Sequence, residues 1–228
     1  SMTLQPMWHS TIFGPYFVAG AIFSGIAALI VAMVTFRKAY GLEAYLKPVH
    51  FNNLGLLLLV MALLWFYFTF AEHLTTFYGN EPAHLIVFYS KLTGPYAPLF
   101  WSMVVTCFVI PVALLSRART RTVTGTVIAS ISVNIGMWLE RFTIVVPTLS
   151  QPRLPWAKSA YSATWVEIGM TLGFGATFIF LYMLFTKFFP IVSIWEVQEG
   201  REQAVPEVVA RVRSYLPGTV ATTGQSEG

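Results

Sequence analysis

The sequence predicts an all-α polytopic transmembrane helical bundle of about five spans, formed by a four-helix bundle and one further helix. The composition is 56% hydrophobic and 11% charged, with a mean hydropathy of +0.65, whereas soluble domains carry about 25% charged residues. Five apolar stretches of 18 or more residues also follow one another along the chain, and a bilayer core needs roughly 20 apolar residues per helix. These stretches are 11–36, 48–71, 92–116, 122–139 and 159–186.

The first three stretches differ in how regular a helix they predict. Residues 11–36 and 48–71 contain no Asp, Glu, Lys or Arg and predict uninterrupted spans. Residues 92–116 are equally free of charge but contain Pro111. Because proline has no N–H to donate, we expect a kink in this helix.

Charged residues directly follow the fourth stretch and lie near one end of the fifth. Residues 122–139 end directly before Glu140 and Arg141, and residues 159–186 contain Glu167, the one charged residue within all five stretches. Charged groups at membrane depth are costly, so they are expected to face the bundle and to pair.

Basic residues in the loops predict the orientation of the bundle. The loops after the first and third stretches hold six Lys and Arg residues, and the opposite loops hold three. The two groups are Arg37, Lys38, Lys47, Arg117, Arg119 and Arg121 against Lys91, Arg153 and Lys158. The excess marks the cytoplasmic side, and a net charge spread over loops in this way does not favour nucleic-acid binding.

Three regions follow from this orientation. Residues 1–10 form an external N-terminal segment, residues 11–189 the transmembrane bundle, and residues 190–228 a cytoplasmic tail that is disordered at its end. An external N-terminus without a signal peptide, before an odd number of spans, indicates part of a longer polypeptide or a split subunit. Cys107 is the single cysteine, so the sequence offers no iron–sulfur or haem c ligand set.

Six ionisable residues are expected at one membrane level, near the external ends of the spans. They are His9, Glu72, His73, Glu140, Arg141 and Glu167. Three carboxylates against one fixed cation leave room for a shared proton, which favours a proton-transfer role. The alternative is that these residues have no role in proton transfer. In that case Glu72, His73 and His9 lie among lipid headgroups, and Glu140 and Arg141 form a structural ion pair. Haem b is not favoured, because only His9 and His73 could pair as axial ligands.

A polar stripe on the fourth span extends this prediction. Thr126, Ser130, Asn134 and Arg141 follow at steps of four, four and seven residues, which places them on one helix face. The stripe leads from the cytoplasmic half toward the external ionisable residues. It therefore predicts a proton path, although Ser and Thr also serve helix packing.

Four segments together resemble a known family of membrane subunits. They are WHSTIFGPYFVAGAIFSG (Trp8–Gly25), FAEH (Phe70–His73), NIGMWLERF (Asn134–Phe142) and IVSIWEVQEG (Ile191–Gly200). They are similar to the polysulfide-reductase/NrfD-type integral membrane subunits, and most of all to the larger such subunit of bacterial alternative complex III. Over residues 8–200 the similarity covers the second bundle and final helix of proteins with roughly twice as many spans, that is, their C-terminal half.

The resemblance implies a haem-free subunit of a quinol:electron-acceptor oxidoreductase in the bacterial cytoplasmic membrane. Its partners would be an iron–sulfur subunit, multihaem cytochrome c subunits and a second NrfD-like membrane subunit, which hold the iron–sulfur clusters and haem c. The quinol, of the menaquinone kind in such chains, is generally bound in the first bundle of these proteins. For the present chain the resemblance implies anchoring of the partners and a proton path coupled to quinol oxidation, through the six ionisable residues and Asn134.

Two other classes of function remain open from the sequence. A secondary proton- or ion-coupled transporter also uses buried acids and histidines, although it is typified by helix breaks in matching positions of two repeats. A purely structural anchor for peripheral subunits would tolerate substitution of every external ionisable residue.

Overall fold

The computed structural model describes residues 7–150, 161–189 and 198. The expected cytoplasmic tail 190–228, apart from Gln198, and the first six residues of the expected external segment lie outside the described residues. The chain divides into two compact units, residues 1–162 and residues 163–228. Each unit is described by itself below.

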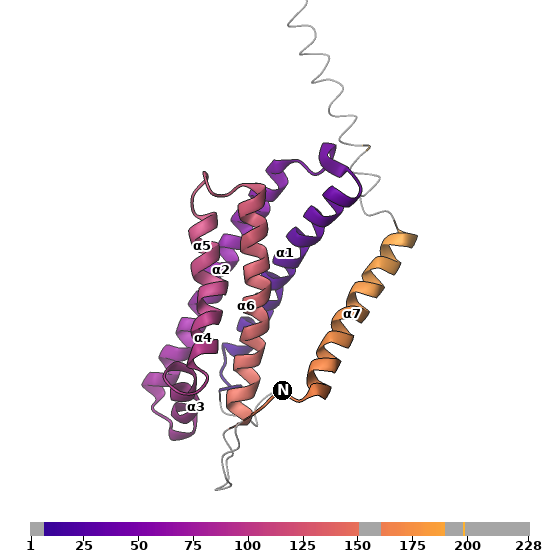
Figure 1. Cartoon of the computed structure of the whole chain (residues 1–228). Coiled ribbons are helices and arrows are strands. Elements are labelled where there is room, and N and C mark those ends of the chain that lie inside the picture. The colour runs from indigo at the N-terminus through magenta and orange to yellow at the C-terminus, as the bar shows by residue number, and fades with distance from the viewer. Residues whose placement is uncertain (1–6, 151–160, 190–197, 199–228) are drawn as a thin grey trace, which may run out of the picture. The chain divides into compact units, whose positions relative to one another are not determined.

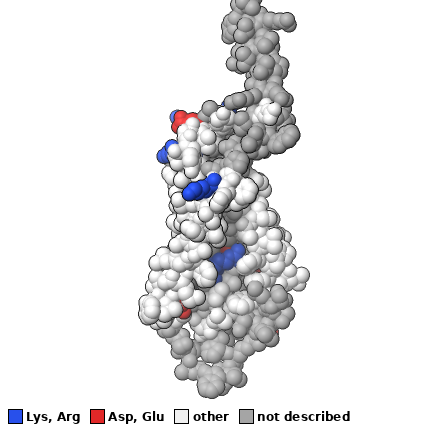
Figure 2. Space-filling model, turned by 90° about the vertical axis from the view of Figure 1, so that its right-hand side faces the viewer, with Lys and Arg blue, Asp and Glu red and all other residues white. Residues whose placement is uncertain are grey.

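Five helices are long and apolar enough to cross a membrane, which confirms the predicted all-α, five-span fold. Four belong to the first unit: α1 (Phe13–Ala39), α2 (Pro48–Gly79), the span Ala97–Leu115 and α6 (Val123–Leu149). The fifth, α7 (Trp165–Phe188), belongs to the second unit. The face drawn in Figure 2 is largely uncharged, with only a few separate patches of Lys and Arg.

Two helices extend further than the hydropathy pattern indicates. α2 continues to Gly79 and α6 to Leu149, whereas the apolar stretches end at 71 and 139. Glu72, His73, Glu140 and Arg141 therefore lie inside helices. A charged residue does not end a helix when neighbouring elements offer it partners, because its cost then falls.

The third span is interrupted where the proline was expected to act. It consists of α4 (Ala97–Val104), a π-helical turn η2 (Val105–Val109) and α5 (Ile110–Leu115). Pro111 is the second residue of α5 and cannot donate to the carbonyl of Cys107, four residues back in this turn. A hydrogen bond from α6 also satisfies a carbonyl of this turn: the Ser132 hydroxyl donates to the Thr106 carbonyl over 2.9 Å.

α6 forms the centre of the first unit and packs against α1, α2 and the third span (Figure 1). Glycines allow the close approach. A Cβ on Gly20 of α1 would lie 3.0 Å from the Met137 side chain, and a Cβ on Gly136 of α6 would lie 2.4 Å from Cys107 Sγ. Phe23, Phe51 and Trp65 fill the interior and are fully buried.

Two short helices complete the first unit. The 3-10 turn η1 (Leu42–Ala44) joins α1 to α2, and α3 (Pro82–Leu92) lies between α2 and α4 at one end of the bundle (Figure 1). The sequence pattern predicted a loop in the region of α3, and Lys91 was counted as a loop residue. α3 contacts α2, α4 and α6, and we call this side of the bundle the α3 end.

Candidate functional site

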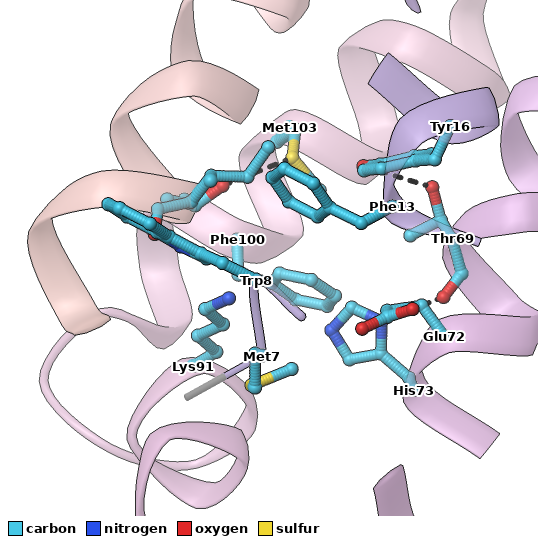
Figure 3. A pocket seen from close by; sticks show the side chains of 12 residues that line it. Met7, Trp8, Phe13, Tyr16, Thr69, Glu72, His73, Lys91, Phe100 and Met103 are labelled. Carbon is cyan, nitrogen blue, oxygen red and sulfur yellow. Dashed lines mark hydrogen bonds between the residues drawn. The ribbon is translucent and has the colours of Figure 1, made fainter. Parts of the chain in front are cut away.

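A small cavity with a few titratable side chains in its wall lies at the α3 end, enclosed by the N-terminal segment and helices α1, α2, α3, α4 and α6. Its volume is about 30 Å³, enough for one or two water molecules. Twelve residues line it: Met7, Trp8, Phe13, Tyr16, Thr69, Glu72, His73, Lys91, Phe100, Met103, Thr143 and Ile144. Figure 3 shows Glu72, His73 and Lys91 around this space, with aromatic rings forming much of the wall. Two of these three polar residues, Glu72 and His73, are among those the sequence singled out.

Glu72 is buried, with 7% of its surface exposed. Its Oε2 accepts a hydrogen bond of 2.7 Å from the Ser10 hydroxyl. The bond ties the N-terminal segment to α2 across the cavity. Neighbouring residues 7 and 8 then form part of the cavity wall.

The hydrogen bonds of His73 determine which of its ring nitrogens can accept a proton. Nδ1 lies 2.7 Å from the Thr69 carbonyl oxygen, and a carbonyl oxygen only accepts, so Nδ1 carries the hydrogen of the neutral ring. Nε2 then presents a lone pair. It is buried and has no hydrogen-bond partner among the described residues, and Figure 3 shows the ring edge directed into the cavity.

Lys91 is the cavity residue that sequence analysis missed, because it counted only as a loop charge. Its side chain reaches the cavity from α3 and is buried, with 6% of its surface exposed. Burial lowers the pKa of Lys91 to about 8, against the opposing influence of the Glu72 carboxylate. Helical spacing in the sequence could have indicated that Lys91 is buried, because it follows the buried Val87 by four residues and Phe88 by three.

Glu140 lies next to the cavity, inside α6, and is almost completely buried. Its Oε1 accepts a hydrogen bond of 2.5 Å from Trp65 Nε1, and its Oε2 is buried without a hydrogen-bond partner among the described residues. The Tyr16 phenol lies close enough to interact electrostatically with this carboxylate. The Tyr16 hydroxyl also accepts a bond of 3.4 Å from Thr69. Since Tyr16 and Thr69 both line the cavity, Tyr16 connects the cavity to Glu140.

Arg141 is the nearest fixed cation to Glu140. Its Nε lies 3.7 Å from Glu140 Oε2, and its guanidinium lies over the Phe17 ring, 3.7 Å from the ring centroid. A third of the side chain is exposed. The pair therefore combines a buried carboxylate with a cation that α1 covers in part.

Other residues of the predicted site lie elsewhere. The His9 ring packs against His84, with ring centroids 4.8 Å apart, rather than against His73. Glu167 belongs to the second unit and lies at the start of α7, where its Oε2 accepts a bond of 2.9 Å from the Thr164 N–H. A capping box begins α7 at Trp165, so Glu167 lies in the first turn of the helix.

The polar stripe is only partly buried. Thr126 and Ser130 are completely buried, whereas Asn134 and Arg141 are half-buried. Steps of 4 residues turn the helix by about 40° beyond a full circle, so Asn134 lies about 80° from Thr126. Between Ser130 and Glu140, the buried positions of α6 are Val133, Gly136 and Met137.

An apolar groove adjoins the cavity on the outside of α2, α3 and α4. Its volume is about 340 Å³. Its walls are mainly aromatic: Phe66, Phe70, Phe77, Phe88, Phe100 and Trp101. Thr69, His73 and Phe100 line both the groove and the cavity. The His73 ring therefore forms part of the partition between the apolar groove and the cavity.

Residues 1–152, which include every element from α1 to α6, match the family described as polysulphide reductase, NrfD. The chain belongs to the polysulphide reductase NrfD family. Its members are integral membrane subunits of quinone-linked oxidoreductases that work with iron–sulfur subunits. The match covers the cavity and the groove but not α7 or the resembling segment at 191–200. No curated protein matches the chain.

Proposed function

We propose that this NrfD-family chain is a haem-free membrane component of a quinol:electron-acceptor oxidoreductase, similar to the larger NrfD-type subunit of alternative complex III. In this proposal the cavity accepts the protons that quinol oxidation releases. The observation that carries the proposal is the position of His73 between the apolar groove and the cavity, with a buried Nε2 that has no partner in the part of the chain that the structure describes.

The groove suits the ring of an isoprenoid quinol. Such a ring is flat and largely apolar, and aromatic walls provide stacking surfaces for it. Because the groove opens on the outside of the bundle, a lipid-soluble substrate reaches it from the membrane. A quinol hydroxyl needs a hydrogen-bond acceptor at the end of such a site, and His73 Nε2 is an acceptor.

Oxidation of one quinol to the quinone releases two electrons and two protons. The chain has one cysteine, so an iron–sulfur cluster that accepts the electrons would be held by a partner subunit. His73 Nε2 takes one proton from a quinol hydroxyl, passes it to the cavity, and then takes the second from the other hydroxyl. Lys91, whose pKa lies at about 8, and Glu72 lie around the same cavity and take up or release the proton through the water that the cavity admits.

Tyr16 gives the proton a further route inward. It borders the cavity and lies close enough to Glu140 to interact with its carboxylate, so Glu140 and Arg141 are the next groups of the proposed proton path. The buried Thr126 and Ser130 hydroxyls continue the polar positions of α6 toward its other end. The anchoring of iron–sulfur and multihaem cytochrome c subunits, a second NrfD-like membrane partner, the use of menaquinone and a bacterial cytoplasmic membrane belong to the same proposal.

The test replaces the acceptor while keeping its shape. His73→Phe preserves an aromatic ring against Phe88 and Phe100, which lie 6.0 and 5.1 Å from the His73 ring centroid, but removes Nε2. We expect quinol:acceptor turnover of the native assembly to fall by about 10²–10⁴-fold, the usual contribution of a general base. His50→Phe, at the other end of α2, is the matched control. Wild-type turnover in an intact His73→Phe assembly would overturn the proposal.

A further inference from the structure

A second cluster of ligating side chains lies at the α3 end, apart from the cavity. His9 precedes α1, Glu81 immediately precedes α3, and His84 lies in the first turn of α3. One ligand atom from each residue lies within 4.8 Å of the other two. Glu81 Oε2 and His84 Nδ1 lie 3.6 Å apart.

We propose that His9, Glu81 and His84 bind one divalent transition-metal ion of the zinc class. Two imidazoles and one carboxylate are a donor set that Zn²⁺ prefers, with a fourth position left for water. Zinc holds such ligands at about 2.0–2.2 Å, which places them roughly 3.3 Å apart in a tetrahedron. His9 and Glu81 are exposed, so small side-chain rotations bring all three atoms to that spacing.

The chemistry of the donors excludes the common hard cations. Mg²⁺ and Ca²⁺ are held by sets of oxygen ligands, and this cluster offers two nitrogen donors. Affinity for an imidazole and carboxylate site rises along the first-row metals toward Cu²⁺ and remains high for Zn²⁺. Zn²⁺, Cu²⁺ and Ni²⁺ are therefore the ions that fit.

Because of the position of His9, a bound metal would also restrict the movement of the neighbouring N-terminal residues. Trp8 lines the cavity and donates from Nε1 to the Ile144 carbonyl over 3.2 Å, and Ser10 donates to Glu72. His9 lies between these two contacts. A metal that joins His9 to Glu81 and His84 fastens residues 7–10 to α3 and holds this part of the cavity wall in place. The inference does not depend on the proposed redox function.

The first experiment measures Zn²⁺ binding to the full chain in detergent. The protein carries no polyhistidine tag, is freed of metal with a chelator, and is titrated with Zn²⁺ against a chromophoric competitor. We expect one tight site per chain. His84→Asn, His9→Asn and Glu81→Gln should each weaken binding, by at least about 100-fold for the histidines, while His50→Asn binds as the wild type does.

Co²⁺ provides a second readout of the same site. Tetrahedral Co²⁺ with nitrogen and oxygen ligands absorbs visible light strongly, and the band should appear in the wild type and vanish in His84→Asn. Equal Zn²⁺ affinity in the wild type and all three variants, or wild-type protein without a stoichiometric site, would overturn the proposal. Thermal denaturation of each variant shows that the fold is retained.

Hydrogen exchange tests this restriction of the N-terminal residues. We expect Zn²⁺ to slow amide exchange in a peptide covering residues 7–16 of the wild type but not of His84→Asn. Zn²⁺ binding that leaves this exchange unchanged would contradict the fastening of residues 7–10 to α3.

Discussion

Lys91 shows how a single buried amine makes stability depend on pH. Its pKa is about 8 in the folded protein and 10.5 ordinarily. Between these values the folded chain has released the proton that the unfolded chain still binds, so the free energy of unfolding rises with pH across this window. We expect Lys91→Met to remove that rise.

The measurement is thermal denaturation of both proteins in detergent from about pH 7 to 11. The difference in Tm between the wild type and Lys91→Met isolates Lys91 from the other groups that titrate there. A difference that stays constant across the window would show that Lys91 keeps its ordinary pKa.

Glu140 is the residue through which the proposed path leaves the cavity. Glu140→Gln keeps the size of the side chain and a partner for Trp65 and Tyr16, but it cannot carry a proton. We expect fewer protons translocated per electron, with assembly retained. Proton-to-electron ratios equal to those of the wild type, measured in vesicles, would rule out this route.

Arg141 is expected to contribute to stability rather than to proton transfer. Arg141→Ala leaves the Glu140 carboxylate without its cation and removes the guanidinium from the Phe17 ring. We expect a loss of about 2 kcal/mol in stability, since the side chain is partly exposed. Arg141→Lys restores the charge without the flat stacking group and should recover only part of it. An unchanged Tm in Arg141→Ala would count against the pairing.

At the scale of the elements, the contact of α6 with the π-helical turn is the tightest helix packing in the first unit that a substitution can test. Gly136→Ala would place a Cβ 2.4 Å from Cys107 Sγ and 3.1 Å from its backbone nitrogen. We expect a loss of about 1–3 kcal/mol from overpacking. Gly25→Ala in α1, where a Cβ meets nothing within 4 Å, is the matched control and should be neutral or stabilising. Comparable Tm values for both variants would show that α6 can move away from the turn.

Hydropathy predicted the five spans because each must be apolar over the thickness of a bilayer. It could not predict the ends of α2 and α6, because these helices continue past buried acids whose partners are distant in sequence. Glu72 in α2 is hydrogen-bonded by Ser10, and Glu140 in α6 is hydrogen-bonded by Trp65 and interacts with Tyr16. The start of α7 could have been predicted from the sequence, because Thr164 and Glu167 have the spacing of a capping box.

The same reasoning explains which parts of the candidate site the sequence missed. α3 is short and was taken as part of a loop, so the burial of Lys91 and the pairing of His84 with His9 were not expected. Membrane depth grouped the ionisable residues only by their expected level, and the structure places Glu72 and His73 in the cavity wall and Glu140 beside Arg141. Membrane depth could not show that His73 separates the cavity from an apolar groove, which depends on how α2, α3 and α4 pack.

At the scale of the whole molecule, the first unit places an apolar groove and a cavity with titratable side chains on either side of one histidine. The groove offers an apolar, membrane-facing site, and the cavity offers titratable groups shielded from bulk solvent. Membership of the NrfD family places such a unit in a quinone-linked membrane complex. In the proposed function, this chain transfers the protons of the quinol and a partner subunit accepts the electrons.

The most direct test of this account is to purify the chain from its native membrane in mild detergent, add quinol without oxygen, and follow the reduction of co-purifying iron–sulfur clusters and haem c. We predict that an iron–sulfur subunit accompanies the chain and that its clusters are reduced by quinol. A chain that purifies alone in several mild detergents, or an assembly whose clusters quinol leaves oxidised, would contradict the account.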